Sequence, residues 1–123
     1  MIKVEIPLKL PSLNDYINKC RSNKFAGATM KKNVDEDIMW YIKDLPRFEN
    51  TIKIHFHWIE ANKRRDFDNI AFAKKFILDA LVKAGKLKDD NRRFVSGFVD
   101  SFDYGDEYKV ILEIEECDIN GYI

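Results

Sequence analysis

TIKIHFHWIEANKRRDFDNIAFAKKFILDALVKAG, residues 51–85, sets the architecture of this 123-residue chain, because a strand pattern runs directly into a helix pattern. Apolar and polar residues alternate from Thr51 to Ile59, which is typical of a half-buried strand. From Asn69 to about Ala84, apolar residues recur at helical spacing. Asp68 is a good N-cap for this helix and Gly85 a good C-terminal stop, so we expect a strand joined to a single helix.

Other elements are expected before this unit. Ile2 to Leu10 alternates like a strand and ends at Pro11. Residues 11–29 contain Pro, Ser, Asn and Gly together with several cations, and they read as a long loop. Residues 33–45 have a broad apolar face and predict a helix that ends before Pro46.

After the unit, Phe94 to Phe102 and Tyr108 to Ile114 predict two strands, joined as a hairpin by the turn-like residues 103–106. The expected order is β-α-β-α-β-β. We therefore expect one α+β domain over residues 1–123, with a mixed sheet and both helices packed on one face.

The composition restricts the class of protein. No apolar run approaches the roughly 20 residues that span a bilayer, and the first residues lack the order of a signal peptide, so a cytoplasmic protein without a membrane partner is expected. Cys20 and Cys117 lack metal-ligand spacing and are expected to be free thiols.

The net charge is zero, but the charges are segregated along the chain. Residues 63–93 carry ten Lys and Arg against five acids, whereas residues 94–123 carry eight acids and one lysine. The basic part can be an electrostatic footprint for DNA and the acidic part a face turned away from it. The alternative is that these cations are simply solvated helix and loop residues.

Four carboxylates lie among the cations, at Asp66, Asp68, Asp89 and Asp90. Carboxylate oxygens are the ligands that Mg²⁺ accepts, and neighbouring Lys and Arg can neutralise a phosphodiester. Other interpretations stay open: Asp68 caps the helix while Asp66 pairs with a neighbouring arginine, and Asp89 and Asp90 form a polar turn.

The spacing of the two clusters suggests a dimer. A helix of about 16 residues separates its ends by about 24 Å, so one subunit is not expected to close the site. If the strand-helix-strand unit is a parallel crossover, a two-fold dimer can bring Asp90 of one chain to Asp66 and Asp68 of its partner.

Further polar residues are candidates with structural alternatives. Lys74 and Lys75 can reach a phosphate or remain solvated. His55 and His57 share one strand face, but no third ligand is evident, so we interpret them as structural or surface histidines. Loop residues can contact unpaired bases or fold back on the core; they are Tyr16, Arg21 and Phe25.

The motif Arg64-Arg65-Asp66-Phe67-Asp68-Asn69, followed by LDALVKAG at 78–85 and by Asp89-Asp90, resembles the RusA family of Holliday junction resolvases. Pro11-Ser12-Leu13-Asn14 is similar to that family's Pro-Ser-x-Asn segment, so the resemblance covers most of residues 5–100. RusA proteins are commonly carried by phages and prophages, and they act in DNA recombination and repair.

The resemblance implies a homodimer that uses Mg²⁺, with Mn²⁺ as a substitute, to nick four-way DNA junctions symmetrically. It implies that Asp66, Asp68 and Asp90 are the catalytic carboxylates. We expect these three to hold the metal, and Asp89 to be either a further ligand or a group that supports the ligands. The family's functional lysine follows the Asp-Asn pair by three residues, where this chain has Phe72; alignment from Leu78 selects Lys75, with Lys74 as substitute. The expected DNA contacts are Asn14, Arg21, Lys24, Lys63, Arg64, Arg65, Lys74 and Asn69.

The expected reaction is hydrolysis of branched DNA, in which the metal activates water for attack on phosphorus. Recognition would rest on branch shape and phosphate contacts, with residues 12–32 entering the junction. The alternative is a non-catalytic module that binds junctions or single-stranded DNA and keeps its affinity in EDTA.

Overall fold

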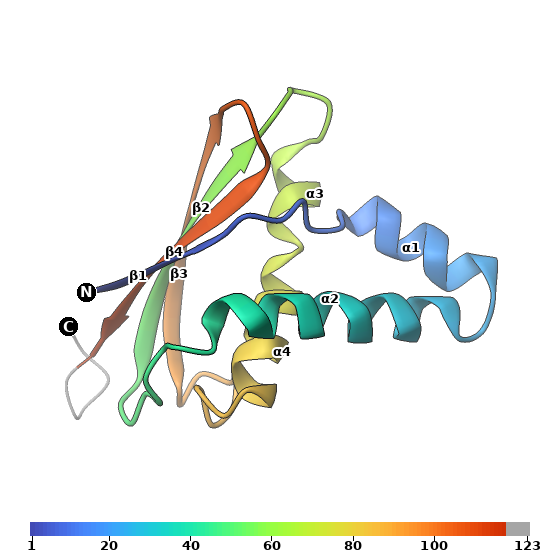
Figure 1. Cartoon of the computed structure of the whole chain (residues 1–123). Coiled ribbons are helices and arrows are strands. Elements are labelled where there is room, and N and C mark those ends of the chain that lie inside the picture. Colours follow the sequence, from blue (N-terminus) through green and yellow to red (C-terminus); the bar gives the residue numbers. More distant parts are fainter. Residues whose placement is uncertain (118–123) are drawn as a thin grey trace.

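The computed structural model describes residues 1–117. Four strands form one mixed sheet in the order β1-β4-β2-β3, and the helices cover one of its faces (Figure 1). The expected α+β class is therefore confirmed. The elements, in chain order, are β1 (Ile2–Ile6), α1 (Leu13–Ser22), α2 (Ala26–Ile42), β2 (Ile52–Glu60), α3 (Phe67–Ala71), α4 (Lys74–Lys83), β3 (Val95–Tyr104) and β4 (Lys109–Glu116).

The core lies between the sheet and the helices. Alternate residues of β2 are buried there, from Ile52 to Glu60, and the buried positions of β4 lie beside them. The helical side of the core comes mainly from α4, whose buried residues are Phe76, Ile77, Leu78, Ala80 and Leu81. The alternation in residues 51–59 thus correctly predicts which side chains enter the core.

The expected hairpin between the last two strands is wrong. β3 and β4 are consecutive in the chain, but β2 lies between them: it pairs with β3 in parallel and with β4 in antiparallel orientation. β4 buries Val110, Leu112 and Ile114 almost completely, whereas Val95 is the single buried residue of β3. The more apolar strand takes the central position, and the polar one takes the edge.

The single helix expected from Asn69 to Ala84 is instead two helices, α3 and α4. Backbone N–H groups of Ala73, Lys75 and Phe76 donate to carbonyls three residues earlier, so the chain is tightened at the break. Asp66, not Asp68, occupies the N-cap position of α3. Gly85 does end α4, in the left-handed region with φ of 72°.

Residues 11–29 do not form the expected loop. Residues 13–22 are α1, and α2 begins at Ala26 rather than near residue 33, so the two helices form a hairpin that extends away from the sheet (Figure 1). Ser12 begins α1 with a capping box: Asp15 N–H donates to the Ser12 hydroxyl, and Ser12 N–H donates to the Asp15 carboxylate. The polar residues at 12–15, which suggested a loop, are a helix-start signal.

The parallel crossover from β2 through α3 and α4 to β3 is confirmed. Ile52, at the start of β2, lies opposite Val95, at the start of β3. Residues 66–68 therefore follow the carboxyl end of β2, while residues 89–90 precede the amino end of β3. β2 spans roughly 26 Å at 3.3 Å per residue, so the two acidic clusters begin from opposite ends of the sheet.

Ion pairs join α2 to α4. Asp35 is completely buried, and its carboxylate accepts hydrogen bonds from Lys31 at 2.9 Å and Lys83 at 2.8 Å. Lys31 also contacts Asp79 on α4 at 2.8 Å. Burial lowers the pKa of Lys31, but the hydrogen bonds to Asp79 and Asp35 outweigh it, so the pKa is raised above the ordinary 10.5.

A pH dependence of stability follows from this lysine. A raised folded-state pKa contributes stability that is fully present below pH 10.5 and is lost as pH rises through the higher folded value. Lys31→Met should lower the free energy of unfolding by about 1–3 kcal/mol at neutral pH and flatten its decline above pH 10.5. Urea titrations at neutral pH and above pH 10.5 measure the free energy of unfolding. Lys32→Met, at an exposed neighbour, is the control. An equally steep decline of this free energy with pH in wild type and Lys31→Met would contradict the prediction.

Among residues 1–117, no helix has both the length and the apolar character needed to cross a bilayer. Asp118, one of the eight acids counted at the carboxyl-terminal end, lies outside the described residues.

Candidate active site

Asp66 and Asp68 are exposed at the start of α3, directly after the connection from β2. The Asp66 side chain makes no capping hydrogen bond. Among residues 1–117, the Asp68 carboxylate accepts a hydrogen bond only from the adjacent Asn69 N–H, at 3.0 Å. Within the described residues, neither carboxylate has a cation within 4.0 Å, so neither the cap nor the ion pair considered as an alternative accounts for this pair.

Arg65 does not pair with these aspartates. Its guanidinium donates two hydrogen bonds to Glu60, at 2.7 and 2.8 Å, and a third to the Leu10 carbonyl at 2.8 Å. The hydrogen bonds to Glu60 raise the pKa of Arg65 further, although burial opposes this. Arg65 therefore has a structural contact, which fixes the connection between β2 and α3; its expected contact with DNA stays a prediction.

Asp90 and Asp89 differ in their surroundings. The Asp89 carboxylate accepts from Asp90 N–H at 2.7 Å and from the Asn91 amide at 3.1 Å, so it closes its own turn. The Asp90 carboxylate instead lies 3.8 Å from the Lys75 ammonium. Asp90 is thus the better candidate ligand, and Asp89 fits the interpretation as a polar turn.

Lys75 is the more available of the two candidate lysines. Its side chain is 59% exposed, and its ammonium lies within 4.0 Å of both Asp79 and Asp90. Lys74 is 2.6 Å from Asp100 and lies over the rings of Phe56 and Phe98. Asp100, which sequence reasoning did not single out, therefore holds Lys74, while Lys75 remains free to approach a phosphate.

The four predicted aspartates do not meet within one chain. In residues 1–117, the one group of three His, Cys, Asp or Glu side chains with mutually close ligand atoms does not include them. The expected separation of about 24 Å between the two acidic clusters assumed one straight helix. The helix breaks between α3 and α4, so that separation no longer follows. Lys75 lies at the start of α4, so its contact with Asp90 shows that the second cluster folds back beside α4.

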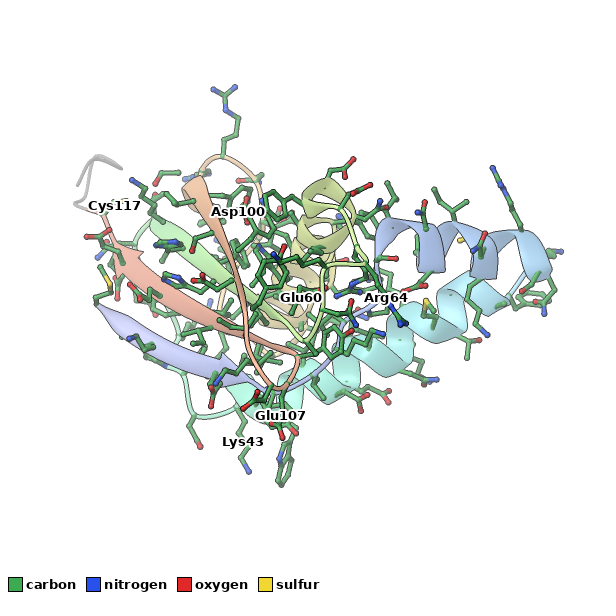
Figure 2. The ribbon with its side chains drawn as sticks, turned by 90° about the horizontal axis from the view of Figure 1, so that it is seen from above. Lys43, Glu60, Arg64, Asp100, Glu107 and Cys117 are labelled. Atoms are coloured by element: carbon green, nitrogen blue, oxygen red, sulfur yellow. The ribbon has the colours of Figure 1, made fainter. Side chains whose placement is uncertain are left out.

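The other expected contacts near Asp66 lie in the connection after β2. Arg64 is exposed, and its backbone N–H donates to Asn62 (Figure 2). Lys63 is exposed and lies over the ring of Tyr104. Asn69 is half-buried in α3. Arg64 and Lys63 thus present cations beside the exposed aspartates.

The remaining candidates lie on or between α1 and α2. Asn14, Arg21 and Lys24 are all exposed. Tyr16 packs against the rings of Phe72 and Phe76, so it folds back on the core as one interpretation had it. Phe25 is 66% exposed between the helices and remains available to stack on a base.

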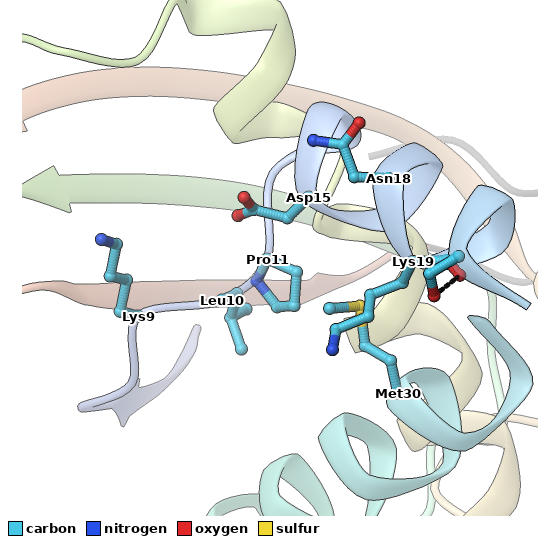
Figure 3. Close-up of a pocket in the computed structure, with 8 residues that line it drawn as sticks. Lys9, Leu10, Pro11, Asp15, Asn18, Lys19 and Met30 are labelled. Carbon is cyan, nitrogen blue, oxygen red and sulfur yellow. Dashed lines mark hydrogen bonds between the residues drawn. The ribbon is translucent and has the colours of Figure 1, made fainter. Parts of the chain in front are cut away.

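A cavity of about 460 Å³ opens between the β1–α1 connection and the two helices (Figure 3). None of the predicted ligands lines it; its residues are Lys9, Leu10, Pro11, Asp15, Asn18, Lys19, Ser22 and Met30. The Asp66 and Asp68 side chains are exposed outside this cavity, so a polymer such as DNA can reach them.

Glu113 is a potential ligand that the sequence did not reveal. It lies opposite His55 in the β2–β4 register and completes a group with His55 and His57. The alternating pattern of residues 108–114 was visible in the sequence. The residue that lies opposite Glu113, however, depended on which strand lies beside β2. The expected β3–β4 hairpin gave the wrong neighbour.

Comparison of the chain with models of known protein families gave no match, and comparison with curated proteins gave none either.

Proposed function

We propose that this protein is a Mg²⁺-dependent endonuclease that resolves four-way DNA junctions by paired symmetric nicks. The observation that carries the proposal is the pair Asp66 and Asp68, exposed and without a cation partner in the described part of the chain although three cations directly precede them. Like-charged carboxylates two residues apart repel each other, and a shared divalent cation would relieve that repulsion. The resemblance of these segments to the RusA family supports the same interpretation.

The donor set fits a hard cation. Asp66 and Asp68 offer oxygen ligands from one segment, and Asp90 would supply a further carboxylate from the partner subunit of a homodimer. Mg²⁺, or Mn²⁺ in its place, would supply a Lewis acid for a phosphate oxygen and an activated water when bound.

The cations of this chain would then neutralise the negative charge of the phosphates. Lys75 is exposed and is held near Asp90 by a long contact of 3.8 Å, which a phosphate can replace. Arg64 and Lys63 lie beside the aspartates and would bind neighbouring phosphates of the same strand. Arg65 would act indirectly, because its bonds to Glu60 hold the connection that carries Asp66.

Recognition of branched DNA is assigned to the helical hairpin of α1 and α2. It projects from the sheet, and it carries exposed Arg21, Lys24 and Phe25 around the turn between the helices (Figure 1). A cationic tip with an exposed aromatic ring suits the unpaired or unstacked bases at a branch point. Backbone contacts of this kind recognise DNA shape more than base sequence.

The experiment compares a four-way junction, labelled in turn on each strand, with a linear duplex of matched sequence, each incubated with Mg²⁺ or EDTA. We expect symmetric nicks in two opposing strands of the junction, none in EDTA, and an uncut duplex. Gel-shift titration at two salt concentrations measures binding in parallel, because phosphate contacts weaken as salt rises.

Each other outcome is informative. Tight junction binding without nicks would replace the enzyme by the binding module. Equal cleavage of junction and duplex would retain the metal-dependent nuclease but remove its junction specificity. Absence of both binding and cleavage would overturn the proposal.

A further inference from the structure

The open face of the sheet, opposite the helices, carries a cluster of nitrogen and oxygen ligands. His55 and His57 lie on β2 and Glu113 on β4, and one ligand atom from each lies within 4.8 Å of the others. From this arrangement we propose that the protein has a second metal site, which binds Zn²⁺ or a similar divalent transition metal through these three side chains. It is separate from the proposed nuclease site in both position and ligand chemistry.

The two histidines are held together on β2. Their rings stack with centroids 3.8 Å apart, and the Ser101 hydroxyl on β3 lies 3.0 Å from His55 Nε2 and 2.8 Å from His57 Nδ1. A serine oxygen can accept two hydrogen bonds. If both rings donate to Ser101, the opposite nitrogens, His55 Nδ1 and His57 Nε2, carry free lone pairs suited to a metal. Such outer hydrogen bonds commonly fix the orientation of metal-binding histidines.

The contact between His57 and Glu113 also favours a shared cation. His57 Nε2 lies 3.1 Å from Glu113 Oε1, yet it is buried and has no partner in the described part of the chain that meets hydrogen-bond geometry. Ligands of a tetrahedral zinc ion, at 2.0–2.2 Å from the metal, lie about 3.3 Å from each other. The pair therefore has the separation of two ligands of one ion without the alignment of a hydrogen bond.

The surroundings leave space for an ion and an exchangeable ligand. A pocket of about 160 Å³ lies at the cluster, lined by Met1, Lys53, His55, Val99, Glu113 and Glu115. Lys3 lies 3.7 Å from Glu113, and its side chain is 67% exposed, so a metal can displace it at low cost. Two imidazoles and one carboxylate with an open fourth position match the ligand set of zinc sites.

Binding would join the two central strands. The ligands come from β2 and β4, which are antiparallel neighbours, so the ion would cross-link them on the face that no helix covers. Nitrogen ligands favour Zn²⁺, Ni²⁺ or Co²⁺ over Mg²⁺. The site should therefore remain indifferent to the metal proposed for cleavage.

The first test uses the wild-type chain without a histidine tag, in which His55 and His57 are the only histidines. One equivalent of Zn²⁺ should shift the side-chain NMR signals of both rings, and millimolar Mg²⁺ should leave them unchanged. If Zn²⁺ leaves the NMR signals of either ring unshifted, the proposal is overturned. This measurement needs no DNA and no variant, so its result is independent of nuclease activity.

The second test measures Zn²⁺ affinity by competition with a chromogenic chelator. Loss of an outer hydrogen bond weakens metal binding 10- to 100-fold, so removal of a ligand in His57→Gln or Glu113→Gln should weaken it by at least about 100-fold. Glu116→Gln removes the same charge from an exposed position of β4 that does not line this pocket, and it should change the affinity little. Equal losses in Glu113→Gln and Glu116→Gln would indicate diffuse attraction to acids and would overturn the assigned ligands.

Discussion

Asp68→Asn should reduce the rate of junction cleavage by at least about a thousandfold while leaving junction binding intact or stronger. The Asp68 carboxylate has no cation partner in the described part of the chain, and its only hydrogen bond comes from the adjacent backbone N–H. Asparagine can accept that same bond, so the fold should persist. It lacks the charge to hold a divalent metal, and its neutrality removes repulsion of the phosphate. Single-turnover cleavage and gel-shift titration measure the two effects separately.

Asp106→Asn is the matched control, because Asp106 is an exposed acid in the connection between β3 and β4. It should cleave at the wild-type rate. If Asp68→Asn retains more than about a tenth of wild-type activity at saturating Mg²⁺, Asp68 is not a metal ligand. A matching loss in both variants would instead indicate a general effect of surface charge.

Mixed dimers test whether Asp90 acts across subunits. In a heterodimer of Asp68→Asn with Asp90→Asn chains, one of the two shared sites would contain both intact aspartates. In an equal mixture with free subunit exchange, half of the dimers are mixed, and each mixed dimer has one intact site of two. The mixture should therefore recover about a quarter of the wild-type sites and give single rather than paired nicks. No recovery in a purified heterodimer would assign Asp90 to the site of its own chain, whereas full activity of the Asp90→Asn homodimer would remove it from the site.

Arg65→Ala should lower the free energy of unfolding by about 3–5 kcal/mol. Glu60 is only 4% exposed, and its carboxylate accepts two hydrogen bonds from this guanidinium. Without Arg65, a buried charge loses its partner, and the Leu10 carbonyl loses a donor. Chemical denaturation monitored by tryptophan fluorescence measures the change.

Arg64→Ala is the matched control, since the neighbouring arginine is exposed and its side chain has no ion pair among residues 1–117. Its effect on stability should stay within about 0.5 kcal/mol. The double change Arg65→Met with Glu60→Leu should recover most of the loss, because apolar replacement of a buried ion pair is often close to neutral. Equal destabilisation by Arg64→Ala and Arg65→Ala would contradict the structural role of Arg65.

The sequence predicted the parts of the fold that depend on local periodicity. Residues 51–59 alternate strictly, and they form β2 with the expected side chains in the core. Gly85 ends α4 as expected, because its backbone adopts a left-handed conformation that other residues disfavour.

Strand neighbours could not be predicted in the same way. The turn residues at 103–106 signalled a hairpin, but burial of Leu112 on a central strand outweighed local turn chemistry. Glu113 was missed for that reason, because strands far apart in the chain decide which residues lie opposite each other in the sheet. Similarly, Arg65 was expected to contact DNA because its partner, Glu60, lies just outside the strand predicted for residues 51–59, whereas the structure buries Glu60 as the last residue of β2.

The position of β4 has a consequence for how the chain folds during synthesis. β4 (Lys109–Glu116) is the last strand in chain order, yet it lies between β1 and β2, whose residues are made long before it. Among residues 1–117, β1 has no neighbour in the sheet except β4, so the emerging chain holds an unpaired first strand until residues 109–116 have left the ribosome. Such long-range closure slows folding. Cells that produce this protein would therefore benefit from a chaperone that shields β1 and β2 during that delay.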